Sequence, residues 1–136
     1  MAKTVLIVDD VAFVRKTINE ILTKAHYQVV GEASDGNEAL ALFQRLKPDI
    51  VTLDIVMPQM SGIETARKLF KLERNVKIVI VSAMGQENLV MEAINVGVKD
   101  YVLKPFTPQD ILRAIESALY SGNRVIGARA QKDRSG

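Results

Sequence analysis

Five side chains that can bind cations or react with phosphate stand directly after short apolar segments of the sequence. Asp9 and Asp10 follow TVLIV, Asp54 follows IVTL, Ser82 follows KIVIV, and Lys104 follows YVL. Carboxylates without histidine or cysteine ligands favour Mg²⁺, and an aspartate can accept a phosphoryl group covalently. If these side chains meet, they suit phosphoryl transfer to Asp54, with Mg²⁺ and Lys104 neutralising the charge.

The segments around these residues alternate between strand and helix patterns five times. Short apolar runs rich in β-branched residues predict strands at 4–8, 28–33, 50–53, 77–81 and 101–103. Apolar residues at helical spacing, with capping signals at Asp35, Ser61 and Thr107, predict helices at 12–25, 35–46, 61–72, 86–96 and 107–119.

Strict alternation of strand and helix predicts an α/β fold with helices on both faces of a parallel sheet. Five strands of this size fit a flavodoxin-like, doubly wound five-stranded parallel sheet in the order 2-1-3-4-5, with five helices. Sites in such sheets form beyond the carboxyl ends of the strands, where the strand order reverses. That point lies between the first and third strands, so the Asp9–Asp10 pair is predicted to face Asp54.

Composition limits the other possibilities. A chain of 136 residues is expected to form one domain. The chain has no cysteine, which excludes disulfides, and a single histidine, which excludes a metal site with several histidine ligands. No apolar run approaches the roughly 18 residues that span a bilayer, and no signal peptide is recognisable, so we expect a cytoplasmic protein without a membrane partner. Residues 122–136 hold four basic and one acidic side chain, which leaves the preceding part nearly neutral and argues against nucleic-acid binding.

Four separated motifs carry a family resemblance. VDD at 8–10, LDIVMP at 53–58, SA at 82–83 and KPF at 104–106 resemble, in this order and spacing, the receiver domain of two-component response regulators. The likeness covers residues 3–120 and extends, through SAMGQ and Tyr101, to the CheY-like single-domain regulators of chemotaxis. It implies a receiver domain at residues 1–121. Residues 122–136 contain Gly, Arg and Ser and few large apolar residues, so we expect them to form a flexible basic tail.

The resemblance also implies a Mg²⁺ site and a phosphorylation site. Asp54 matches the phosphorylated aspartate, which forms an aspartyl phosphate. Asp10 and Asp54 match direct Mg²⁺ ligands, the backbone carbonyl of Val56 matches a third protein ligand, and Asp9 matches the acid that acts through metal-bound water.

Further roles are implied for the residues at the ends of the last two strands. Lys104 matches the lysine that pairs with the phosphoryl group, and Ser82 matches the hydroxyl that moves to hydrogen-bond it. Tyr101 matches the aromatic switch that turns inward when this hydroxyl moves. The Lys104–Pro105 bond matches a cis peptide bond of the family.

The implied function is a phosphorylation-activated signalling switch rather than an enzyme, since its only catalysis is its own phosphoryl transfer and dephosphorylation. Its partners would be a CheA-like sensor histidine kinase and an output protein, such as the flagellar motor switch, bound through residues 86–120. A phosphorelay shuttle that passes phosphate to a histidine phosphotransfer protein is an alternative with the same site.

Two other classes fit the sequence poorly. A flavodoxin-type FMN carrier needs a phosphate-binding first loop, whereas Asp9-Asp10-Val11 would repel phosphate, and the chain has no Trp to stack on a flavin. A hydrolase with an aspartate nucleophile would normally carry a second Asp after the nucleophile, whereas residues 55–56 are Ile-Val.

One departure from the family pattern affects an expected rate. Val56 and Met84 are both apolar. In the family, these two positions border the path of the hydrolytic water, and many relatives have a polar side chain at the position of Val56. We expect these side chains to orient water poorly, so that the phosphoryl group persists longer than in relatives with polar residues there.

Overall fold

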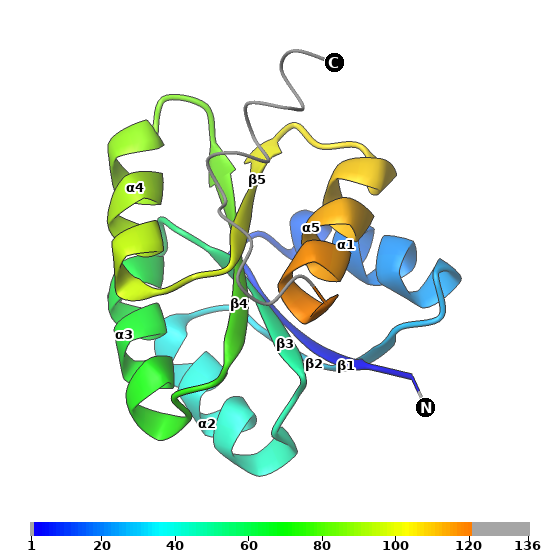
Figure 1. The fold of residues 1–136 in the computed structure, drawn as a ribbon, viewed down its shortest axis with the longest axis horizontal. Helices are drawn as coiled ribbons and strands as arrows, with labels where there is room; N and C mark the ends of the chain where they lie inside the picture. The colour runs from blue at the N-terminus through cyan, green and yellow to red at the C-terminus, as the bar shows by residue number, and fades with distance from the viewer. Residues whose placement is uncertain (1, 121–136) are drawn as a thin grey trace.

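A computed structural model describes residues 2–120 of the chain. Five strands form one parallel sheet in the order β2-β1-β3-β4-β5, which confirms the predicted flavodoxin-like topology. Strands and helices alternate along the chain as predicted (Figure 1), in the order β1 (Thr4–Val8), α1 (Ala12–Lys24), β2 (Gln28–Ala33), α2 (Gly36–Leu46), β3 (Ile50–Asp54), α3 (Gly62–Leu72), β4 (Lys77–Ala83), α4 (Glu87–Val96), β5 (Asp100–Lys104) and α5 (Pro108–Tyr120).

Burial separates the central strands from the edge strands. Nearly every residue of β1, β3 and β4 is buried, because helices cover both faces of the sheet there. Such strands are expected to be continuous apolar runs rather than alternating patterns. The edge strands β2 and β5 are only partly buried, which explains the weaker apolar pattern of QVVGEA at 28–33.

The sheet divides the interior into two hydrophobic cores, since successive strand residues point to opposite faces. On one face α2, α3 and α4 pack over Leu6, Leu53 and Ile80. On the other face α1 and α5 pack over Ile7 and Val79. Figure 1 shows these two groups of helices on opposite sides of the sheet.

Three helices begin at the predicted capping residues. The side chains of Asp35, Ser61 and Thr107 accept hydrogen bonds from the backbone N–H groups three residues later, at 2.8, 3.1 and 3.1 Å. Asp110 also accepts from the Thr107 N–H at 2.9 Å, so the cap of α5 is reciprocal. These caps satisfy N–H groups that the first helical turn leaves without partners.

The strand ends differ slightly from the prediction. Asp54, Ser82 and Lys104 are members of β3, β4 and β5 rather than residues that follow them, because the parallel ladder continues to the edge of the buried sheet. The first helix ends at Lys24, one residue earlier than predicted. The predicted tail at 122–136 lies outside the described residues.

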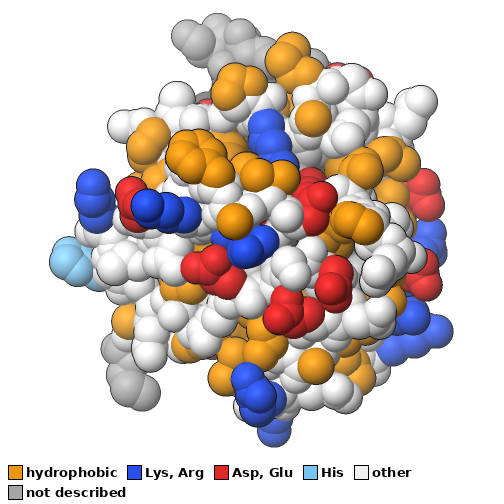
Figure 2. Space-filling model, turned by 180° about the vertical axis from the view of Figure 1, so that it is seen from behind, with side chains coloured by type: hydrophobic (Ala, Val, Ile, Leu, Met, Phe, Trp, Pro, Cys, Tyr) orange, Lys and Arg blue, Asp and Glu red, His pale blue; other side chains and the backbone are white. Residues whose placement is uncertain are grey.

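Charged side chains of both signs are scattered over the surface. On the face shown in Figure 2, acidic and basic side chains are interspersed among groups of hydrophobic ones. Within residues 2–120, the structure contains no helix that is both long and apolar enough to cross a membrane.

Candidate functional site

The register of the sheet brings the five chemically active side chains to one edge. Val8 pairs with Leu53, so Asp9 comes directly beside Asp54 at the carboxyl ends of β1 and β3. Asp54 in turn pairs with Val81, the neighbour of Ser82, and Ala83 pairs with Lys104. The strand order therefore places Lys104 two strands from Asp54, as the sequence predicts, with Ser82 between them.

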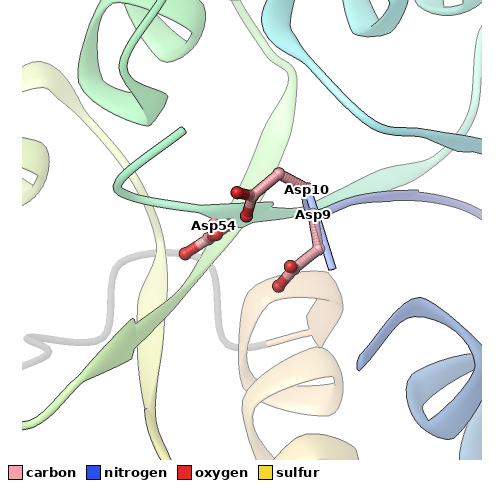
Figure 3. Close-up of side chains that lie close together, drawn as sticks. All are labelled: Asp9, Asp10 and Asp54. Atoms are coloured by element: carbon pink, nitrogen blue, oxygen red, sulfur yellow. The ribbon is translucent and has the colours of Figure 1, made fainter. Parts of the chain in front are cut away.

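Three carboxylates converge at this edge (Figure 3). One ligand oxygen from each of Asp9, Asp10 and Asp54 lies within 4.8 Å of the others. Asp9 and Asp54 are buried, with 1% and 5% of their surface exposed, whereas Asp10 is exposed. Burial, the charge of Asp9 and a hydrogen bond with Asp10 together raise the pKa of Asp54 to about 7.

Lys104 supplies a positive charge to this cluster. Its Nζ lies 3.1 Å from Asp9 Oδ2 and 3.5 Å from Asp54 Oδ1, so one ammonium is shared by two buried carboxylates. Lys104 lowers the pKa of Asp54, but burial and the neighbouring acids outweigh it. One lysine therefore leaves the three-carboxylate cluster with excess negative charge.

Ser82 lies beside the cluster with an unused hydroxyl. Its side chain is fully buried, and its Oγ has no hydrogen-bond partner among the described residues. Leaving a buried hydroxyl without a partner costs roughly 1–3 kcal/mol. The Ser82 hydroxyl is therefore suited to donate a hydrogen bond to an anionic group bound at Asp54. Tyr101 is half-buried and packs against the same core as Ser82's strand neighbours Ile78 and Ile80.

The loop after Asp54 is held tightly against α3. Gly62, the first residue of α3, donates its N–H to Ile55 O at 2.9 Å. A Cβ at position 62 would collide with the Asp54 carbonyl oxygen and would lie 2.7 Å from Ile55 Cα. Glycine is therefore required for α3 to begin this close to Asp54.

The residues present fit a hard divalent cation. Carboxylate oxygens are the ligands that Mg²⁺ prefers, and repulsion within the cluster favours any cation that neutralises it. The buried hydroxyl of Ser82 and the ammonium of Lys104 add hydrogen-bond donors for an anionic group bound at Asp54. The arrangement can therefore accept a phosphoryl group on a carboxylate.

Comparison with known proteins identifies the family of the chain. Residues 5–116 match the response regulator receiver domain family. The chain belongs to this family. The predicted resemblance to receiver domains is thereby confirmed over almost all of the described residues.

Several relatives of this receiver domain are chemotaxis proteins. The chemotaxis protein CheY of Thermotoga maritima is 50% identical over 115 residues, which cover 85% of this chain and 96% of that relative. CheY of Bacillus subtilis is 42% identical over 119 residues, which cover 88% of this chain and 99% of that relative. A chain in the crystal structure of the CheX–CheY–BeF₃–Mg²⁺ complex from Borrelia burgdorferi superposes with a TM-score of 0.81 at 34% identity, covering 85% of this chain and 87% of that chain. The chain is a CheY-like receiver domain of a two-component system.

Two exposed apolar side chains lie in the loops that follow β3 and β4. Val56, in the loop after Asp54, is 50% exposed, and Met84, in the loop after β4, is 73% exposed. The peptide bond between Lys104 and Pro105 is cis. Val56, Met84 and Pro105 each follow, within two residues, a strand that ends at this edge.

One residue at this edge could not be predicted from the motifs. Arg15, on α1, donates from Nη1 to the backbone oxygen of Asp9 at 2.7 Å. It is not part of any of the four motifs. Its place, six residues after Asp9 on a helix that begins at Ala12, is the only signal in the sequence that could have indicated this contact.

Proposed function

We propose that Asp54 accepts a phosphoryl group from a phosphohistidine of a sensor kinase and that this receiver domain then acts as a signalling switch. The observation that carries the proposal is the position of Asp54 itself. It is a buried carboxylate whose neighbours are two further acids, a shared ammonium and a buried hydroxyl that has no hydrogen-bond partner in the described part of the chain. This set of groups suits an aspartyl phosphate better than a permanently unmodified carboxylate.

The donor set of the acidic cluster fits Mg²⁺. Asp10 and Asp54 would bind it directly with the backbone carbonyl of Val56, and Asp9 would act through bound water. When bound, Mg²⁺ neutralises the charge of the transferring phosphoryl group.

In the proposed transfer, an oxygen of Asp54 forms a bond to phosphorus while the bond from phosphorus to the donor imidazole nitrogen breaks. The imidazole nitrogen takes up a proton, and the product is an aspartyl phosphate. Lys104 lies 3.5 Å from Asp54 and stabilises the added negative charge with its ammonium. Later attack by water returns the carboxylate and releases phosphate, so the protein catalyses only its own transfer and dephosphorylation.

The proposed switch uses Ser82 and Tyr101. The Ser82 hydroxyl gains a phosphoryl oxygen as its partner, and the half-buried Tyr101 ring occupies the space that opens when this hydroxyl moves. Phosphorylation shifts the population toward the active state because the phosphoryl group interacts better with that state. The output surface is assigned to residues 86–120, where Met91 and Leu103 are 57% and 40% exposed.

The relatives favour particular partners. Because several similar proteins are chemotaxis proteins, we propose a CheA-like histidine kinase as the donor and the flagellar motor switch as the output target. The same relatives favour this role over that of a phosphorelay shuttle, and they suggest a cytoplasmic location. The complex of the Borrelia burgdorferi relative with CheX suggests a CheX-like protein as a further partner.

The decisive experiment incubates the protein with acetyl phosphate and Mg²⁺ and measures intact mass. We expect the mass of one phosphoryl group on the wild type, none on Asp54→Asn, and the wild-type result for the surface control Glu20→Gln. Binding of the phosphorylated protein to motor-switch peptides and to histidine phosphotransfer domains then separates switch from shuttle. Labelling of Asp54→Asn to the wild-type extent would refute the assignment of Asp54.

A further inference from the structure

A chain of hydrogen bonds joins the acidic cluster to α1 and β2. Arg15 Nη1 donates to the Asp9 backbone oxygen at 2.7 Å, and Arg15 Nε donates to Glu32 Oε1 at 3.2 Å. Asn19 Nδ2 donates to the other oxygen of Glu32 at 2.8 Å. The Arg15 side chain is only 18% exposed, so this guanidinium is fixed between the strand end and β2.

Asp9 is held at each of its polar atoms. Its N–H donates to Ala33 O at 3.0 Å, and its Oδ1 accepts from the Val11 N–H at 2.9 Å. Its Oδ2 faces Lys104 at 3.1 Å, and its backbone oxygen accepts from Arg15. These contacts define the turn from Asp9 to Val11, and that turn positions Asp10.

We propose that Arg15, held by Glu32, is a positioning residue that fixes the Asp9–Val11 turn and thereby strengthens Mg²⁺ binding. This inference rests on the proposed function, because it concerns the same metal site. The guanidinium suits the task, since its planar fork donates to the Asp9 carbonyl and to Glu32 at once. A lysine ammonium lacks this fork and would serve the two partners less well.

The charge and the positioning effect of Arg15 act on Mg²⁺ in opposite directions. A positive charge near the site repels the cation, so its removal would tighten Mg²⁺ binding if charge alone mattered. Loss of positioning would weaken binding, since groups that hold metal ligands typically contribute about 10-fold or more to metal affinity. The sign of the change therefore distinguishes the two effects.

The experiment measures the Mg²⁺ dissociation constant by isothermal titration at fixed ionic strength. The variants are Arg15→Gln and the charge-balanced pair Arg15→Gln with Glu32→Gln, and the control is Lys16→Gln, which removes the same charge from the exposed neighbouring position of α1. We expect about 10-fold weaker binding in both Arg15 variants. Lys16→Gln should bind with wild-type affinity or slightly more tightly.

A second measurement does not require metal. Hydrogen exchange of the Val11 amide, which is bonded to Asp9 Oδ1, should become faster in Arg15→Gln without Mg²⁺ and should stay unchanged in Lys16→Gln. If Arg15→Gln fails to fold by circular dichroism, Arg15→Lys replaces it, with intermediate values expected for both measurements.

The outcomes separate this inference from the function on which it rests. Wild-type protein that binds Mg²⁺, together with an Arg15 variant that binds as tightly or more tightly, overturns the positioning role and leaves the proposed function intact. Wild-type protein that binds no Mg²⁺ overturns both.

Discussion

The ammonium of Lys104 lies closer to Asp9 than to Asp54, at 3.1 Å against 3.5 Å. Without a phosphoryl group, the lysine is therefore anchored by the acid that is not the proposed acceptor. Asp54 therefore interacts more weakly with the Lys104 ammonium than Asp9 does, in agreement with the raised pKa of Asp54. This geometry fits the proposal that Lys104 moves its interaction from Asp9 toward a phosphoryl group on Asp54.

Replacement of Lys104 should separate anion binding from cation binding. In Lys104→Gln we expect beryllofluoride, a phosphoryl analogue, to bind at least about tenfold more weakly with Mg²⁺ present, because a hydrogen bond to a charged group contributes roughly 1.5–3 kcal/mol. Mg²⁺ alone should bind as tightly as in the wild type or more tightly, since a repelling charge is lost. NMR titrations measure both affinities, with Lys71→Gln at an exposed position of α3 as the control. Weaker Mg²⁺ binding in Lys104→Gln would contradict the assignment of Lys104 to anion binding.

Asp54 should make the protein less stable as pH rises. Its pKa is raised from 3.8 to about 7 in the folded state, so the native protein binds this proton more tightly than the unfolded chain does. The free energy of unfolding therefore falls between about pH 4 and pH 7 and is level above that window. Asp54→Asn should be more stable than the wild type by up to about 4 kcal/mol at about pH 8, with little difference at about pH 4.

Chemical denaturation without Mg²⁺ at these two pH values tests the effect, with Glu20→Gln as a surface control. Added Mg²⁺ should stabilise the wild type at the higher pH and reduce its difference from Asp54→Asn. A stability difference that is the same at both pH values would show that burial of the Asp54 charge is not its cause.

The unpartnered hydroxyl of Ser82 gives a prediction with a matched control in the same sheet. Within residues 2–120, Thr52 Oγ1 on β3 is also buried without a hydrogen-bond partner, although it lies below the site rather than at the strand edge. Because each hydroxyl lacks a partner, Ser82→Ala and Thr52→Val should leave the free energy of unfolding unchanged or raise it by about 1 kcal/mol.

Only the Ser82 change should affect the response to the phosphoryl analogue. With beryllofluoride and Mg²⁺, Ser82→Ala should show smaller amide shifts across α4 and β5 than the wild type, whereas Thr52→Val should show the full shifts. Equal responses from both variants would remove Ser82 from the proposed switch.

The exposed apolar side chains of Val56 and Met84 should slow loss of the phosphoryl group. The double variant Val56→Asn with Met84→Glu should dephosphorylate about tenfold faster, because polar groups at these positions can orient water. We expect a smaller effect than that of a well-placed general base, which accelerates a reaction roughly 100-fold or more. Decay of the phosphorylated protein, followed by intact mass, gives the rate. Met91→Glu, at an exposed position on α4, is the control, and an unchanged or slower rate in the double variant would count against the idea.

Much of the site could be predicted because it follows from strand ends. A parallel sheet gathers the carboxyl ends of its strands, so Asp9, Asp54 and Lys104 could be placed together once the strand order was inferred. The contact between Arg15 and Asp9 could not be predicted in this way. It depends on the rotation of α1 about its axis and on the partner Glu32 of an edge strand, and no local pattern encodes either.

The close approach of α3 to Asp54 could not be predicted from local sequence patterns either. The sequence predicts Ser61 as a cap, but it gives no reason why Gly62 must lack a side chain. The reason is the Asp54 carbonyl oxygen, which lies in the space that a Cβ at position 62 would occupy.

The sheet separates the proposed phosphoacceptor from the proposed switch hydroxyl. Thr52 and Asp54 follow the strand alternation toward the face covered by α1 and α5, whereas Ser82 lies in line with Ile78 and Ile80 on the face covered by α3 and α4. The proposed output surface at residues 86–120 includes α4 from the second face and α5 from the first, so it spans both hydrophobic cores. Mutations that adapt this surface to a new target would therefore have to preserve packing in both cores, whereas mutations on α2 or α3 would affect only one core.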